Sequence, residues 1–135
     1  LKFSVADPDF IVPEKLHTLS LAQNAIQDLS EVHPNFLRKV RYLDMSDNKI
    51  REVRYHGHFD KSAPLQNLDL SHNNVSVVED CAFCNTSLHT LNLAYNGMNS
   101  ANRHDQLREY TSKNVIFTLI LGGLHLTRKV MKART

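Results

Sequence analysis

One pattern, L-x-x-L-x-L-x-x-N-x-L, recurs four times in the chain and constrains its fold more than any other feature. Valine, isoleucine or methionine replaces some of the leucines. The four copies cover residues 16–26, 40–50, 65–75 and 88–98. Their asparagines, Asn24, Asn48, Asn73 and Asn96, are spaced by 24, 25 and 23 residues. A repeat of this length, kept in phase over several copies, predicts a solenoid of stacked coils.

The two central leucines of each copy predict a short strand. They are two residues apart, so both side chains point to one face of the strand and the residues between them point to the other. One coil cannot bury its leucine face alone, but stacked coils bury these faces in a continuous core. The asparagine ends the strand, where its side-chain amide can pair with backbone groups that the turn would otherwise leave unsatisfied.

Size and composition fit one continuous domain. The chain has 135 residues, of which 41% are hydrophobic, and this suffices for a solenoid core. The formal net charge of +2 is too small to indicate a nucleic acid or an anionic membrane surface as the partner. The first residue is Leu1 and no signal peptide precedes the repeats, so we expect a processed product or a fragment of a longer protein.

The segments that follow each asparagine, here called the returns, are expected to supply the rest of the core. An aromatic residue recurs near the end of each of the first three. The predicted core residues of these returns are Ile26, Leu29, Phe36, Leu37, Ile50, Val53, Phe59, Val75, Val78 and Phe83. The fourth return, residues 100–113, is longer, and Ser100 is placed to cap a short helix there.

Both ends depart from the pattern. Residues 1–15 form either an irregular cap or the return half of an upstream coil, and we favour the coil. The apolar positions of residues 116–126 fit a fifth, degenerate coil in which Leu124 replaces the asparagine. The alternative for this segment is part of a membrane span, although its apolar run is shorter than the roughly 20 residues that a bilayer requires. Residues 127–135 are a basic tail that we expect to be truncated.

Over residues 16–126 the chain resembles the leucine-rich repeat family. The period and the late phenylalanine are similar to the repeats common in secreted proteins and receptor ectodomains. The resemblance implies an α/β fold, a leucine-rich repeat solenoid with short parallel strands on its concave face and irregular or short helical returns. It also implies use in protein recognition. The cysteine-rich caps that usually flank extracellular members are absent from this sequence.

The residues that could carry chemistry do not form an enzyme site. Cys81 and Cys84 make one C-x-x-C, but they flank a predicted core residue, and a zinc site would need a second pair. We interpret them as unreactive, with a local disulfide as the alternative. His56 and His58 lie in a predicted return loop that we expect to be solvated. We therefore predict no catalysis, no metal and no cofactor.

Two glycosylation sequons occur, at Asn74 and Asn85. Chance predicts about as many in a chain with this content of asparagine, serine and threonine, so they are no evidence of secretion.

Binding is predicted on the concave face, which the residues on either side of the buried leucines line. The central positions Asp44, Asp69 and Asn92 carry small polar residues that are common filler in the family. Less generic side chains lie on or beside the strands, and tyrosine and arginine are favoured at protein interfaces. The candidate binding residues are Arg41, Tyr42, Asp47, His72, His89 and Tyr95.

These features predict a non-enzymatic protein-recognition module with a protein ligand. We expect a fragment of a receptor ectodomain or secreted binding protein, at the cell surface or outside the cell. The alternative is an intracellular scaffold or regulatory subunit in the cytoplasm, which the missing cysteine caps favour. Nucleic acid and small-molecule cofactors are not expected as partners, and a membrane is expected only through missing parts of the chain.

Overall fold

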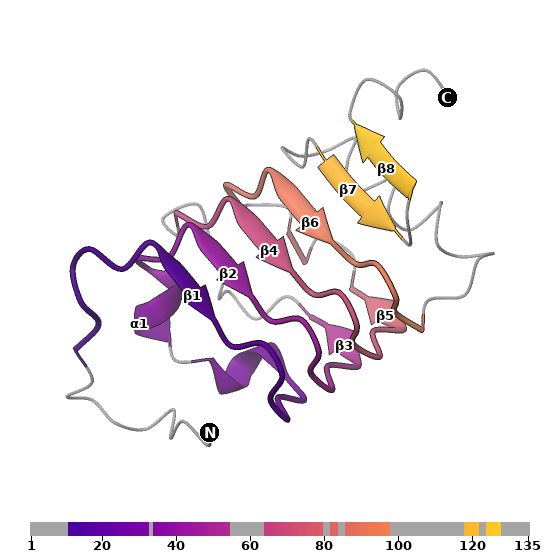
Figure 1. Cartoon of the computed structure of the whole chain (residues 1–135), viewed down its shortest axis with the longest axis horizontal. Coiled ribbons are helices and arrows are strands. Elements are labelled where there is room, and N and C mark those ends of the chain that lie inside the picture. Colours follow the sequence, from indigo (N-terminus) through magenta and orange to yellow (C-terminus); the bar gives the residue numbers. More distant parts are fainter. Residues whose placement is uncertain are drawn as a thin grey trace.

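Short strands alternate with irregular connections in the computed structural model of the chain (Figure 1). The structure describes residues 11–32, 34–54, 64–79, 82–83, 86–97, 118–121 and 124–127. Its elements are β1 (Thr18–Ser20), a 3-10 helix η1 (Leu29–Glu31), α1 (Pro34–Leu37), β2 (Tyr42–Asp44), β3 (Glu52–Val53), β4 (Asn67–Asp69), β5 (Val77–Val78), β6 (Thr90–Asn92), β7 (Thr118–Leu121) and β8 (Leu124–Thr127).

The larger sheet has the strand order β1-β2-β4-β6-β7-β8, and every pair up to β6–β7 is parallel. The second leucine of each copy lies beside its counterpart in the next: Leu19 pairs with Leu43, Leu43 with Leu68, Leu68 with Leu91 and Leu91 with Leu119. The predicted phase of the four copies is therefore confirmed. Parallel strands one coil apart are the geometry expected of a solenoid.

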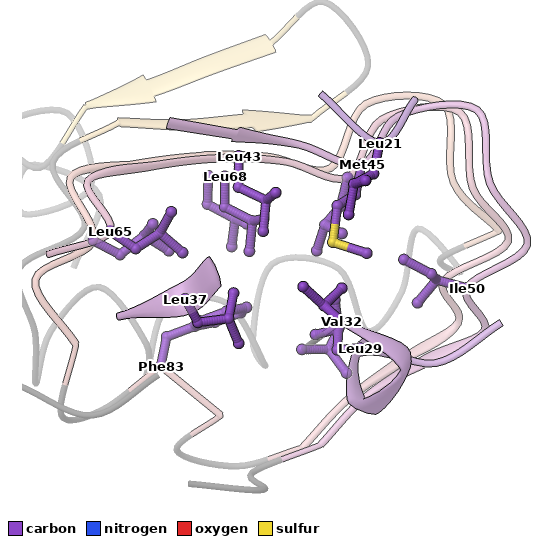
Figure 2. Packing of buried hydrophobic residues seen from close by; sticks show 14 of the residues in the cluster. Leu21, Leu29, Val32, Leu37, Leu43, Met45, Ile50, Leu65, Leu68 and Phe83 are labelled. Carbon is purple, nitrogen blue, oxygen red and sulfur yellow. The ribbon is translucent and has the colours of Figure 1, made fainter. Parts of the chain in front are cut away.

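The core lies between this sheet and the returns, and equivalent side chains of successive coils pack one behind another (Figure 2). Leu43, Met45 and Ile50 have no exposed surface, and Leu68 is 1% exposed. The returns contribute as predicted, because Ile26, Leu29, Phe36, Leu37, Ile50, Val53, Val75, Val78 and Phe83 are all buried. Phe59 lies outside the described residues. Val12, from the N-terminal segment, also joins the core.

The returns are irregular or briefly helical, as expected. In the first, Asp28 caps η1, because its carboxylate accepts a bond of 2.7 Å from the Ser30 amide. The Glu31 carboxylate accepts in turn from the Asp28 amide at 3.1 Å, which completes a capping box. In the second and third returns, β3 and β5 pair in parallel as a small second sheet.

The repeated asparagines form a ladder that joins neighbouring coils. The Nδ2 atom of Asn48 donates to the carbonyls of Leu21, Met45 and Ser46 at 3.0 to 3.1 Å, and its Oδ1 accepts from the Ile26 amide at 3.1 Å. Asn73 and Asn96 repeat this arrangement one and two coils later. The side chain thus satisfies turn groups of its own coil and of the preceding one.

The fifth coil begins as predicted and ends differently. Its strand, β7, adds to the sheet in parallel, but β8 then folds back antiparallel to β7, with Leu121 opposite Leu124. The strand of the degenerate fifth coil is therefore present, but Leu124 begins a strand that folds back on β7. The physical reason lies in the sequence between the strands, since Gly122-Gly123 suits a two-residue hairpin and Leu124 lacks the amide that joins one coil to the next.

Several predictions fall on residues outside the described part of the chain. These are the coil assigned to the segment before Ile11, the short helix of residues 100–113, the cysteine pair, the two histidines of the second return and the tail from residue 128. Among the residues that are described, none belongs to a helix with the length and apolar character needed to cross a membrane. Part of a membrane span was the alternative for residues 116–126, and the described residues of this segment form strands.

Candidate functional site

The solvent-facing side of the large sheet is lined by two rows of side chains that flank the buried leucines. Register aligns the first row as Thr18, Tyr42, Asn67 and Thr90, and the second as Ser20, Asp44, Asp69 and Asn92. We call these eight residues the sheet face. Each is exposed or half-buried, whereas the leucine between them in β2, β4 and β6 is buried. The variable positions of the repeat thus form one continuous surface, as predicted.

The second row holds two aspartates side by side. Asp44 lies opposite Asp69 in the parallel pair β2–β4. One oxygen of each carboxylate accepts a bond from the amide two residues later, at 3.0 Å from Ser46 and 2.8 Å from Ser71. These bonds fix the carboxylates at the strand ends. The aspartates therefore help to shape the turn, as the scaffold interpretation expected, but they also place two negative charges together on the surface.

Tyr42 is the aromatic residue of the first row, and its side chain is 40% exposed. The pKa of its phenol is raised above the ordinary value, first by partial burial and then by the negative charges of Asp69 and Asp44. The phenol is therefore a protonated hydrogen-bond donor at neutral pH. Its position beside both carboxylates makes this part of the sheet face amphipathic.

A third row, which we call the rim, follows the strands and consists of Gln23, Asp47, His72 and Tyr95. Each of these residues precedes a ladder asparagine and has a positive φ, between 53° and 56°. Residues other than glycine adopt this conformation rarely, because the Cβ atom crowds the backbone. The ladder bonds around each turn compensate for this cost, and all four side chains are exposed. The rim is a product of the turn and not of the strand.

Two rim residues form an aromatic pair. The rings of His72 and Tyr95 stack with their centroids 4.4 Å apart and an interplanar angle of 16°. Tyr95 nevertheless keeps 67% of its surface exposed. The pair, contributed by two neighbouring coils, presents a stacked aromatic surface to solvent.

The opposite ends of the strands carry another row, which we call the entry row: His17, Arg41, Gln66 and His89. Backbone bonds of 2.8 Å connect Arg41 to His17, Gln66 to Arg41 and His89 to Gln66, so the row follows the stacking of the coils. All four residues are exposed.

The predicted binding residues therefore do not share one location. Tyr42 lies on the sheet face, Arg41 and His89 on the entry row, and Asp47, His72 and Tyr95 on the rim. The structure brings His72 and Tyr95 together and places Tyr42 at the other end of the strands.

Asp44 and Asp69 belong to the positions that the sequence analysis interprets as common filler of the family. The signal that identifies them as neighbours was their shared position in two consecutive copies of the repeat.

Other kinds of site receive no support from the described residues. They contain no group of three or more histidine, cysteine, aspartate or glutamate side chains able to hold a metal. An open hollow of about 240 Å³ is lined by Ile11, Val12, Asn35, Arg38 and Lys39. This volume is below the range of about 300–1,000 Å³ usual for small-molecule sites. The sequon residue Asn74 is exposed, and Asn85 lies outside the described residues.

Models of known protein families support this architecture. Models described as leucine-rich repeat match residues 14–74, 64–86 and 84–101. The chain belongs to the leucine-rich repeat family. Leucine-rich repeat domains generally mediate protein–protein interaction and generally lack enzymatic activity, so a protein partner is supported. No curated protein matches the chain significantly.

Proposed function

We propose that this leucine-rich repeat protein is a non-enzymatic recognition module whose protein partner binds across the sheet face and the rim. One observation carries the proposal: strands in strict register hold exposed side chains from successive coils in fixed rows. The backbone has little freedom left to lose on binding, and such preorganisation favours affinity. The exposed aromatic surface of Tyr42 and Tyr95 supplies the type of anchor that dominates protein interfaces.

The proposal is tested by comparing two double variants. Tyr42→Ala with Tyr95→Ala is expected to weaken the cognate partner by more than about 2 kcal/mol, a typical value for aromatic anchors. Arg51→Ala with Arg54→Ala is expected to cost less than about 1 kcal/mol, because both residues are exposed on the second return and Arg54 already pairs with Glu52. A binding titration against a partner recovered by pull-down measures both, with folding checked by circular dichroism. A larger loss in the arginine variant would move the recognition surface to the returns.

The absence of enzymatic activity is a separate part of the proposal. Phe83, between the two cysteines, is 1% exposed and belongs to the core, which supports a structural setting for this segment. Changing Cys81 and Cys84 to serine is expected to leave partner binding intact and to lower stability modestly. Thiol titration with a reductase assay, run on both proteins, provides the measurement. A redox or metal-dependent activity that disappears in the serine variant would contradict the proposal.

For localisation we propose a receptor ectodomain or secreted protein, with an intracellular scaffold as the second candidate. The repeat period supports the first. The residues that flank the repeats in the full protein discriminate between them: a signal peptide and cysteine caps support the extracellular candidate, and their absence supports the intracellular one.

A further inference from the structure

Two negative charges lie next to each other at the centre of the sheet face. Asp44 and Asp69 are directly paired across β2 and β4, and neighbouring strands lie about 5 Å apart. Like charges directly opposite each other destabilise a sheet. Their neighbours in the row, Ser20 and Asn92, are neutral, so the negative charge is confined to the second and third coils. A cation placed between the two carboxylates would relieve this repulsion.

The two carboxylates are held in place before any ligand arrives. One oxygen of each is fixed by the amide of Ser46 or Ser71. The other oxygen accepts from a neighbouring coil, from Ser20 Oγ at 3.3 Å in Asp44 and from Asn92 Nδ2 at 3.2 Å in Asp69. A carboxylate oxygen has two lone pairs, and Asp44 Oδ1 also accepts from Ser46 Oγ at 2.7 Å. Acceptor capacity therefore remains on Asp44 Oδ2 and on both oxygens of Asp69.

Tyr42 adds an aromatic wall to the same place. It precedes Asp44 by two residues on the same face of β2, and its phenol experiences the fields of both Asp69 and Asp44. An arginine side chain stacks on aromatic rings and pairs with carboxylates through a planar fork of donors. Carboxylates beside an exposed tyrosine therefore favour a guanidinium over an ammonium group.

A positive charge lies near this acidic pair along the chain. Arg41 is exposed on the entry row, three residues before Asp44. Within the part of the chain that the structure describes, Arg41 pairs with no carboxylate. The surface thus carries charges of opposite sign in a defined order along the strand direction.

We propose that the partner presents an arginine to the Asp44–Asp69 pair and an acidic group to Arg41. This inference rests on the proposed function and specifies the chemistry of the partner. The charge pattern then sets the direction in which the partner crosses the sheet, because the reversed orientation would bring like charges together.

The chain itself supplies the substitution that removes charge without disturbing the turn. In the fourth coil, Asn92 occupies the position of Asp44 and Asp69, and its Oδ1 accepts the same bond from the amide two residues later, at 3.0 Å. Asp44→Asn with Asp69→Asn should therefore keep both turn bonds and the fold. The turn bonds would be retained in this variant, although Asn92 Nδ2 would lose the second oxygen of Asp69 as its acceptor. The attraction for a cation would be lost.

The test uses a random peptide library displayed on phage and selected on the whole chain at low ionic strength, where exposed charges are least screened. Enriched peptides are expected to combine an arginine with an acidic residue. Their affinity should fall about 10- to 100-fold for Asp44→Asn with Asp69→Asn, as loss of charge-assisted hydrogen bonds predicts, while circular dichroism shows that the variant stays folded. Arg41→Gln should reduce affinity less than the aspartate pair does and should relax the preference for the acidic residue.

The outcomes separate this inference from the proposed function. Peptides that lose binding in the Tyr42→Ala, Tyr95→Ala variant but bind the asparagine variant as tightly as the original protein would overturn the charge inference and leave the recognition surface in place. Peptides indifferent to both variants, or failure to recover any binder, would overturn both. A fall in affinity that is rescued by Asp44→Glu with Asp69→Glu would support the role of charge.

Discussion

Asn48→Leu is expected to lower the free energy of unfolding by about 3 kcal/mol or more, because several buried backbone groups lose their partner at once. The Asn48 side chain is 8% exposed, donates to three carbonyls and accepts from one amide. Leucine fills a similar volume but can form none of these bonds. The loss also disconnects two coils, since two of the four groups belong to the preceding coil.

Two other asparagines provide control variants with smaller expected losses of stability. Asn24, in the first copy, is half-buried, and its side chain donates twice within its own coil, to the carbonyls of Leu21 and Ala22. Asn24→Leu is therefore expected to cost roughly half as much as Asn48→Leu, or about 1–2 kcal/mol. Asn74→Ala, one position beyond the ladder and exposed, should cost less than about 0.5 kcal/mol.

Urea denaturation followed by circular dichroism measures all three variants under the same conditions. The loss in free energy of unfolding is expected to be largest for Asn48→Leu, smaller for Asn24→Leu and smallest for Asn74→Ala. Equal urea midpoints for the Asn48 and Asn74 variants would show that the hydrogen bonds of the ladder do not stabilise the fold.

Phe83→Ala is expected to cost about 3–5 kcal/mol, the usual range for removing a buried phenylalanine, because the cavity it leaves cannot fully collapse. Phe83 is 1% exposed and lies among the core side chains on the side of the returns (Figure 2). It is one of the largest fully buried side chains among the described residues. In a solenoid each coil contacts only its neighbours, so a cavity in the third return weakens its junctions with the adjacent coils.

Val77→Ala is the matched control, since Val77 lies in β5 of the same return and is 46% exposed. It should change stability by less than about 1 kcal/mol. Thermal unfolding of the two variants beside the original protein provides the comparison. A small shift for Phe83→Ala would mean that this return is not packed as the structure shows.

The repeat pattern alone determined the phase of the strands, the identity of the core and the role of the asparagines. Each of these follows from a local rule repeated in register: leucines two residues apart share one face, and a strand that ends in a buried turn needs a side chain that both donates and accepts. Because every coil obeys the same rule, one correct assignment at Leu43 or Asn48 fixes the equivalent residues in all the others.

Tertiary structure alone decided what the rows on the surface contain and where the solenoid ends. The sequence could not reveal that the rings of His72 and Tyr95 stack, because this depends on a positive φ at two turns and on the spacing of coils. The pairing of Asp44 with Asp69 follows from the phase of the repeat, but only the structure shows which groups hold each carboxylate. At the last coil, the apolar pattern of residues 116–126 is equally compatible with a parallel coil and with a hairpin, since both bury alternate side chains. Which of the two forms depends on the partner that each strand finds, and β8 pairs with its own neighbour β7 in antiparallel orientation.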